Sequence, residues 1–264
     1  MLKLRHVSKT FHPGTPNENH VIRDLSLELA DGEFVTVIGS NGAGKSTLLN
    51  LISGAVLPDQ GQITIDGRDI TYWPEHKRAR FLGHVFQDPL LGTAGDMMIE
   101  ENLAIARRRG QRRRLIWGLK ASERAGYRQL LSSLGLGLEQ RLENRVGLLS
   151  GGQRQALTLL MATMSRPRLL LLDEHSAALD PKTAQTVLEL TQKLVQEQAL
   201  STLMITHNMR DALKYGDRLI MMNEGQIIFD IRGEAKKSTK VSDLLDLFEK
   251  AAGDTVLSDR MLLS

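Results

Sequence analysis

The chain has 264 residues, of which 41% are hydrophobic and 25% are charged, and its formal net charge is +3. This composition is typical of a soluble globular protein, the length fits one α/β domain with a smaller lobe, and no nucleic-acid partner is expected from so small a charge. The absence of cysteine excludes disulfides and thiolate metal sites, and no run approaches the ~18 apolar residues of a membrane span.

The N-terminal part is predicted to be rich in strands, because apolar residues alternate there between turn-forming residues. A loop rich in Pro, Gly and Asn at 12–20 separates the first two strands. A helix is expected at 45–53, shortly after a β-rich run that ends in glycine. The strands are predicted at residues 2–7, 25–29, 33–39 and 62–67.

A helical insertion is predicted from about residue 99 to 149, because this segment is rich in Leu, Arg and Glu and is interrupted by glycines. Strand–helix alternation then returns. The remaining elements are expected as a buried strand at 168–174, a helix at 181–198, a buried strand at 202–206, a hairpin at 218–230 that turns at 223–225, and a late helix with Val241, Leu244, Leu245 and Phe248 on one face.

A glycine-rich motif follows the strand predicted at 33–39. The sequence GSNGAGKST matches G-x-x-x-x-G-K-[ST] and lies between a strand and a helix, where backbone N–H groups converge on phosphate. Lys45 supplies a positive charge to the β- and γ-phosphates, and Ser46 offers a hydroxyl to Mg²⁺, which prefers oxygen ligands. A turn that binds nothing is the alternative, and the strand context argues against it. The expected ATP-binding residues of this motif are Gly39, Ser40, Asn41, Gly42, Ala43, Gly44, Lys45, Ser46 and Thr47.

Two adjacent carboxylates end the buried strand at 168–174. Ligands of open α/β sheets bind at the carboxyl ends of the strands, so Asp173 is expected to hold Mg²⁺, directly or through water. Glu174 is expected to orient or deprotonate the attacking water. The alternative is a pair of solvated acids at a strand exit, and the upstream phosphate motif makes this alternative the weaker one.

The order of the motifs closely resembles the nucleotide-binding subunit of ABC transporters. The similarity runs from the N-terminus to about Asp230, and LSGGQ is its most specific element, because other P-loop ATPases lack it. The motifs are GSNGAGKST, Gln87 in VFQDP, LSGGQRQAL at 149–157, LLLLDE, SAALD at 176–180 and the pair Thr206-His207.

This resemblance implies a role for each matched position. Phe11 should stack on adenine, with a core aromatic as an equal alternative. Gln87 should contact Mg²⁺ and the attacking water and sense the membrane partner. His207 should contact the γ-phosphate, the alternative being an ordinary histidine at a strand end. Asp180 should lie at a dimer interface. The signature residues, which should bind the γ-phosphate of the opposite subunit in a head-to-tail dimer, are Leu149, Ser150, Gly151, Gly152 and Gln153.

The resemblance also implies an α/β fold, a P-loop NTPase with a RecA-like core, an N-terminal antiparallel β-subdomain and an inserted helical subdomain. The ATPase domain is expected at 1–230, with the helical subdomain inserted at about 88–165 and a short C-terminal helical extension at 231–264. The expected cofactors are ATP and Mg²⁺.

One position departs from the family pattern, in which Pro and Thr commonly follow the catalytic Glu. His175 and Ser176 stand there instead, and a tolerated substitution is the simplest interpretation. A basic segment from Arg107 to Arg128 contains nine Arg or Lys, one Glu and Trp117. It is expected either to be a solvated helical face or to contact anionic lipid headgroups.

The sequence therefore predicts an ATPase subunit that energises a membrane transporter from the cytoplasmic face, as a peripheral subunit. The expected partners are permease subunits, a second copy of the chain and an extracytoplasmic solute-binding protein. Import is favoured, since many exporters fuse the ATPase to its membrane domain, and the pattern from 147 to 184 most resembles importer ATPases of the tryptophan/tyrosine type. The alternatives are a soluble ABC ATPase of the iron–sulfur assembly type and the ATPase of a split exporter.

Overall fold

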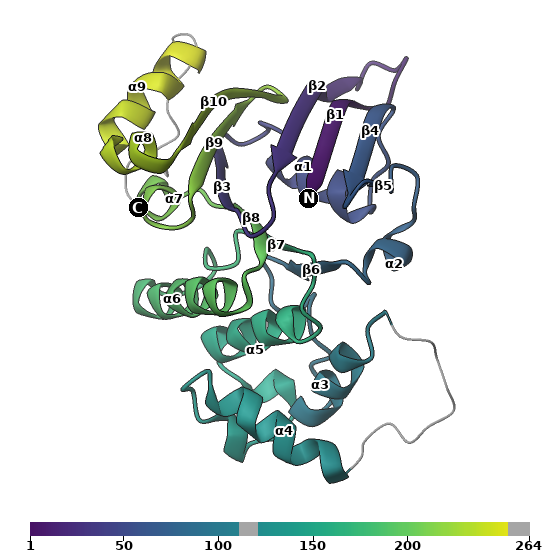
Figure 1. The fold of residues 1–264 in the computed structure, drawn as a ribbon, viewed down its shortest axis with the longest axis vertical. Helices are drawn as coiled ribbons and strands as arrows, with labels where there is room; N and C mark the ends of the chain where they lie inside the picture. Colours follow the sequence, from purple (N-terminus) through teal and green to yellow (C-terminus); the bar gives the residue numbers. More distant parts are fainter. Residues whose placement is uncertain (111–120, 253–264) are drawn as a thin grey trace. The chain divides into compact units, whose positions relative to one another are not determined.

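The computed structural model describes residues 1–110 and 121–252 of the chain. The chain forms two compact units, whose elements are labelled in Figure 1. The first unit contains Met1–Arg78 and the chain from Ser201 onward, and the second contains Ala79–Leu200. In the part of the chain that the structure describes, no helix is long and apolar enough to cross a membrane.

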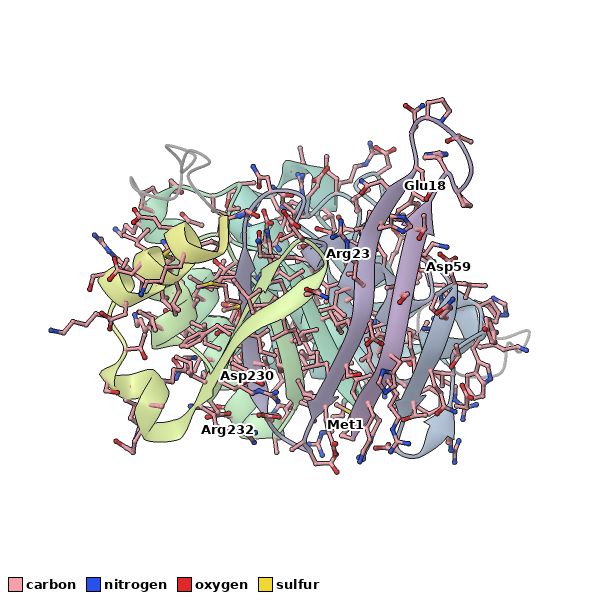
Figure 2. All side chains as sticks on the ribbon, turned by 90° about the horizontal axis from the view of Figure 1, so that it is seen from above. Met1, Glu18, Arg23, Asp59, Asp230 and Arg232 are labelled. Atoms are coloured by element: carbon pink, nitrogen blue, oxygen red, sulfur yellow. The ribbon has the colours of Figure 1, made fainter. Side chains whose placement is uncertain are left out.

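An antiparallel sheet forms the N-terminal part of the first unit. Its buried face arises from alternation: Leu2 lies opposite Leu29 on one neighbouring strand and Ile65 on the other, and all three are buried. Figure 2 labels Glu18 in the loop that projects beyond the first two strands. In spatial order the strands are β2 (Asn19–Leu29), β1 (Leu2–Phe11), β4 (Gln60–Ile65) and β5 (Arg68–Asp69).

A second group of strands in the first unit leads into the glycine-rich loop. Strand β3 runs parallel to both of its neighbours and is buried at every residue, which explains its continuous apolar run. In spatial order these strands are β10 (Gln226–Arg232), β9 (Arg218–Asn223), β3 (Phe34–Gly39) and β8 (Ser201–Ile205). The helices of this unit are α1 (Lys45–Ser53), α2 (Glu75–Arg78), α7 (Met209–Lys214), α8 (Gly233–Ser238) and α9 (Val241–Ala252).

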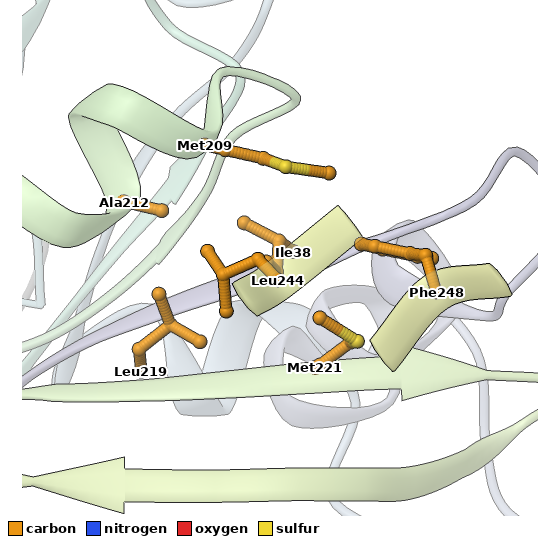
Figure 3. Packing of buried hydrophobic residues seen from close by; sticks show 7 residues of the cluster. All are labelled: Ile38, Met209, Ala212, Leu219, Met221, Leu244 and Phe248. Carbon is orange, nitrogen blue, oxygen red and sulfur yellow. The ribbon is translucent and has the colours of Figure 1, made fainter. Parts of the chain in front are cut away.

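The C-terminal helix α9 packs on the strand that carries the glycine-rich loop. Leu244 and Phe248 lie one turn apart on α9 and point toward β3, β9 and α7 (Figure 3). Their spacing is that of a single helix face, so the predicted apolar stripe is the buried side of α9. The fully buried cluster consists of Ile38, Met209, Ala212, Leu219, Met221, Leu244 and Phe248.

The second unit combines two parallel strands with a group of helices. The strands β6 (Leu82–Val85) and β7 (Leu169–Asp173) pair along their length, and the first four residues of β7 are buried leucines. The helices are α3 (Ile99–Arg107), α4 (Ala121–Ser132), α5 (Gly151–Thr163) and α6 (Pro181–Gln198), with the short 3-10 helices η1 (Leu138–Gln140) and η2 (Val146–Leu148) between α4 and α5.

Most predicted elements are confirmed, and α1 and α6 occupy the predicted residues 45–53 and 181–198. The strand β2 begins at Asn19, inside the predicted loop, because β1 and β2 stay paired as far as Phe11 and Asn19. The sequence patterns do not predict β6 or α7, since each is too short to show a period.

Candidate active site

The glycine-rich loop joins β3 to α1 in the first unit. Gly42 and Gly44 have φ of 82° and 95°, which glycine adopts without steric cost. Lys45 is only 5% exposed, and its ammonium group donates hydrogen bonds to the carbonyl oxygens of Gly39 at 2.8 Å and Ser40 at 2.9 Å. The loop therefore wraps around a positive charge at the N-terminus of a helix, an arrangement that suits a phosphate.

The turn between β9 and β10 supports this loop. The N–H of Gly225 donates to the carbonyl oxygen of Ala43 at 3.1 Å, and the N–H of Arg23 on β2 donates to the carbonyl oxygen of Gly225 at 3.1 Å. The hydroxyl of Ser40 lies 3.4 Å from the amide oxygen of Asn223, at the end of β9. Sequence reasoning missed both Asn223 and Gly225 as neighbours of the phosphate motif, because in the sequence they show only a turn.

Arg78 fixes the far end of the helix that begins at Lys45. This arginine is fully buried, and its Nη1 donates to the carbonyl oxygens of Leu51 at 2.6 Å and Ile52 at 3.0 Å, in the last turn of α1. Burial lowers the pKa of Arg78 to about 10, so the side chain keeps its charge at neutral pH. A positive charge is favourable at the C-terminus of a helix, so Arg78 stabilises α1 in place.

Two further predicted site residues belong to the first unit. His207 follows β8, and Val37 of β3 lies opposite Ile205. Gly39 and His207 both stand two residues beyond that pair, so the chain leaves the sheet at the same edge at both positions. Phe11 ends β1 and is half-buried, with the Lys9 ammonium 5.6 Å from its ring centroid, so its ring is not a fully enclosed core aromatic.

The second unit repeats this geometry with Gln87 and Glu174. Val85 of β6 lies opposite Leu172 of β7, and Gln87 and Glu174 both follow two residues later. Gln87 is exposed and Glu174 is half-buried. Both residues therefore lie at the carboxyl ends of the parallel strands β6 and β7, with Asp173 beside Glu174. Behind Gln87, the side chain of Gln155 on α5 donates to the carbonyl oxygen of Phe86 at 3.2 Å.

The signature residues start helix α5. Ser150 is exposed and caps the helix, because its hydroxyl accepts a hydrogen bond from the Gln153 N–H at 3.3 Å while the Gln153 side chain accepts from the Ser150 N–H at 3.2 Å. A Cβ on Gly152 would lie 2.1 Å from a methyl carbon of Thr183 on α6. Gly152 therefore has a packing reason to be glycine in addition to the expected phosphate role, whereas Gly151 is exposed beside Ser150.

Asp180 and His175 each make a hydrogen-bond contact with a residue of helix α6. The carboxylate of Asp180 accepts a hydrogen bond from the Thr183 N–H at 3.1 Å, and hydrogen bonding to Thr183 lowers the pKa of this exposed acid. His175 is buried, its Nε2 lies 2.9 Å from Oγ1 of Thr191, and burial lowers its pKa to about 4. A helix cap and a buried anchor are thus present at the two positions.

Comparison with known proteins identifies the family. The family model described as ABC transporter matches residues 22–177. The chain belongs to the ABC transporter family. A tyrosine transport ATP-binding protein of Clostridioides difficile is 45% identical over 95% of this chain and 100% of its own length. A carnitine transport ATP-binding protein of Listeria monocytogenes is 33% identical over 95% of this chain, which spans only 60% of that relative.

A solved dimeric ATP-binding cassette, in a post-hydrolysis state with ADP and Pi, has the same fold as this ABC chain. It superposes with a TM-score of 0.74 at 28% identity, over 88% of this chain and 98% of its own. The predicted α/β P-loop NTPase fold is therefore confirmed. The chain is an ATP-binding subunit of an ABC transporter and an ATPase.

The predicted site residues of this ABC subunit fall into two groups, one in each unit. The structure brings His207 to the sheet edge of the glycine-rich loop in the first unit, and Gln87 to the edge of Asp173 and Glu174 in the second. Residues Arg112, Arg113, Arg114 and Trp117 of the basic segment lie outside the described residues. Among those described, no group of three or more His, Cys, Asp or Glu side chains is arranged to hold a metal ion.

Proposed function

We propose that this ATPase energises the import of an amino acid or a similar small solute. The observation that carries the proposal is the similarity to a tyrosine transport ATP-binding protein, which extends over that protein's whole length. The similarity to a carnitine transport ATP-binding protein supports the broader class of small-solute transport. Two alternatives to import are the ATPase of a split exporter and a soluble ATPase of the iron–sulfur assembly type. The tests below distinguish import from both.

In this proposal the site residues act as their environments suggest. Lys45 neutralises the β- and γ-phosphates, and the residues Gly39 to Thr47 supply backbone N–H groups to them. Phe11 stacks on the adenine, and His207 contacts the γ-phosphate. Glu174 orients or deprotonates the attacking water.

Each unit offers oxygen donors of the kind that Mg²⁺ prefers. In the first unit Ser46 presents an exposed hydroxyl in the first turn of α1. In the second unit Gln87 presents an exposed amide oxygen and Asp173 a half-buried carboxylate at neighbouring strand ends. Mg²⁺ usually keeps several waters and binds phosphate oxygens, so it needs few protein ligands. Bound there, the ion would neutralise charge on the phosphates during hydrolysis.

The proposed working form is a head-to-tail dimer on the cytoplasmic face of the membrane, bound to permease subunits and served by a solute-binding protein outside. Leu149 to Gln153 of each subunit then cap the γ-phosphate held by the other, with Asp180 at the interface. Two copies related by a twofold axis complete both sites at once. The solved cassette with ADP and Pi is dimeric, which supports this assembly.

The dimer is tested by trapping it with ATP. Glu174→Gln removes the base but keeps the shape of the side chain, so this variant should elute as a dimer in ATP and Mg²⁺ during size-exclusion chromatography. Ser150→Arg in the same background places a bulky charge in the interface and should restore the monomer, while the exposed Ser132→Arg on α4 should not. A Ser150→Arg double variant that still dimerises would remove the signature from the interface.

Import itself is tested in proteoliposomes that contain the permease encoded beside this gene. Labelled tyrosine should accumulate only with ATP on the side of the ATPase, and the Glu174→Gln subunit should abolish the uptake. ATP-driven loss of solute from preloaded vesicles would instead identify a split exporter. Failure to bind any permease would favour the soluble class.

A further inference from the structure

The side chain of His175 anchors the chain directly behind Glu174 to helix α6. His175 is 2% exposed, and its Nε2 lies 2.9 Å from Oγ1 of Thr191. The Thr191 hydroxyl donates its single proton to the carbonyl oxygen of Val187 at 2.8 Å, so toward the histidine it acts as an acceptor. The imidazole therefore donates this hydrogen bond through Nε2–H.

Glu174 itself has an unfavourable backbone conformation. Its φ is 46°, in the left-handed region that residues with a side chain rarely adopt. On one side the chain is fixed by β7, whose Leu172 pairs with Val85, and on the other by His175. Such a conformation persists only where the surrounding structure holds it, and it commonly marks a functional position.

The loop that follows Glu174 is attached to α6 at two separate points. Asp180 caps the first turn of the helix, while Thr191 lies about 16 Å further along it, at a rise of 1.5 Å per residue. Thr191 is on the buried face, together with Leu188 and Leu194, so it is a fixed point of the unit. Within the loop the Ala177 N–H donates to the carbonyl oxygen of Glu174 at 2.9 Å. The cap holds the end of the loop, and the histidine holds its beginning.

We infer that His175 is a positioning residue for hydrolysis: through its hydrogen bond to Thr191 it keeps Glu174 in the left-handed conformation that aims the carboxylate at the attacking water. The inference rests on the proposed role of Glu174 as the base. The position that departs from the family pattern thereby gains a role of its own.

The test uses Thr191, which is buried on α6 and is not one of the proposed site residues. Thr191→Val keeps the shape of the side chain but removes the acceptor, whereas Thr191→Ser keeps the hydroxyl. In the full-length chain, Thr191→Val should lower kcat for ATP hydrolysis roughly fivefold, the factor for one ordinary hydrogen bond, with KM unchanged. Thr191→Ser should restore kcat. His175→Leu should behave like Thr191→Val, and His175→Gln, which keeps an N–H donor, should recover part of the rate.

A double-variant cycle separates positioning from packing. If both side chains act through one bond, His175→Leu combined with Thr191→Val should lower kcat no further than either change alone. A Thr191→Val variant with the wild-type kcat and only a lower urea midpoint would reduce His175 to a core residue. Glu174→Gln provides the reference: abolished hydrolysis with retained ATP binding keeps the base assignment, and in that background Thr191→Val should leave the residual rate unchanged. A normal rate in Glu174→Gln would overturn both ideas together.

Discussion

The N–H of Gly225 donates a hydrogen bond of 3.1 Å to the carbonyl oxygen of Ala43, which joins the β9–β10 turn to the glycine-rich loop. The contact is close because Gly44 and Gly225 have no side chains that would keep the two backbones apart. A Cβ on Gly225 would lie 2.4 Å from the carbonyl oxygen of Val21, and one on Gly44 would lie 2.8 Å from the same atom. The loop shape therefore depends on three chain segments that meet through backbone atoms.

Gly225→Ala should disturb that meeting point and weaken ATP binding. The new methyl group meets backbone rather than a movable side chain, so the loop or β2 must shift, at a cost of about 1–3 kcal/mol in stability. Gly67→Ala is the matched control, since Gly67 has φ of 75°, close to the 79° of Gly225, but nothing within 4 Å of its Cβ position. Urea unfolding measures the stability of the two variants, and nucleotide titration measures their ATP affinity. The affinity should fall in Gly225→Ala alone. Equal affinity in the two variants would show that the turn does not shape the loop.

Lys45→Ala should abolish tight ATP binding while the chain stays folded. The ammonium group lies among loop carbonyls, with Gly39 O at 2.8 Å and Ser40 O at 2.9 Å, and the core does not depend on it. Isothermal titration with ATP should detect no tight binding, and the circular dichroism spectrum should match the wild type. Lys3→Ala is the control for loss of one positive charge, because Lys3 is half-buried on β1 and its side chain is 40% exposed. Undiminished ATP turnover in Lys45→Ala would contradict the assignment of the loop.

The sequence predicts those parts of the fold whose signals are local. Helix α1 is predicted at its full length because the Gly-Lys-Ser-Thr motif marks its start and Gly54, in the left-handed conformation with φ of 86°, marks its end. Helix α6 is predicted because Asp180 and Pro181 form a cap and a first turn. In both cases a few neighbouring residues carry the whole signal.

Contacts between distant residues could not be predicted in the same way. Ala43 and Gly225 meet although most of the chain separates them, and Gln155 supports Phe86 across 69 positions. A glycine is also ambiguous in sequence: Gly152 suits a phosphate, yet it equally suits the close approach of Thr183. His175 is the clearest case, because a departure from a motif does not reveal which side chain it contacts.

The stability of the protein should fall in mild acid, in part because of His84. Its ring packs at 4.0 Å from the ring of Phe86, and burial lowers its pKa from 6.5 to about 4. Below pH 6.5 the unfolded chain therefore binds a proton that the folded chain does not, so the unfolding free energy decreases as the pH falls toward 4, by on the order of 3 kcal/mol in total. His175 acts in the same direction, since burial lowers its pKa to about 4 as well.

His84→Leu should remove the part of this dependence that belongs to His84. Urea unfolding at pH 7.5, 6.0 and 5.0 should show a shallower fall in the variant than in the wild type, with the two curves converging or crossing toward acid. His84→Phe, which also lacks a titratable group, should give the same slope. Parallel curves for all three proteins would mean that His84 takes up its proton equally in the folded and unfolded states.

Gln87→Ala should reduce transport more than it reduces ATP affinity. Gln87 is exposed at the sheet edge beside Glu174, and the chain that follows it is bound to the region of the signature: the Val146 N–H donates to the carbonyl oxygen of Met97 at 3.0 Å, and the Gly147 N–H to that of Gly95 at 2.8 Å. In the proposed function Gln87 transmits a change at the nucleotide to the permease, whereas Lys45 and its loop hold the phosphates. Proteoliposome uptake and ATP titration on the same preparation measure the two effects, with the exposed Gln62→Ala on β4 as the control. If uptake and affinity fall by the same factor, Gln87 is a nucleotide ligand and nothing more.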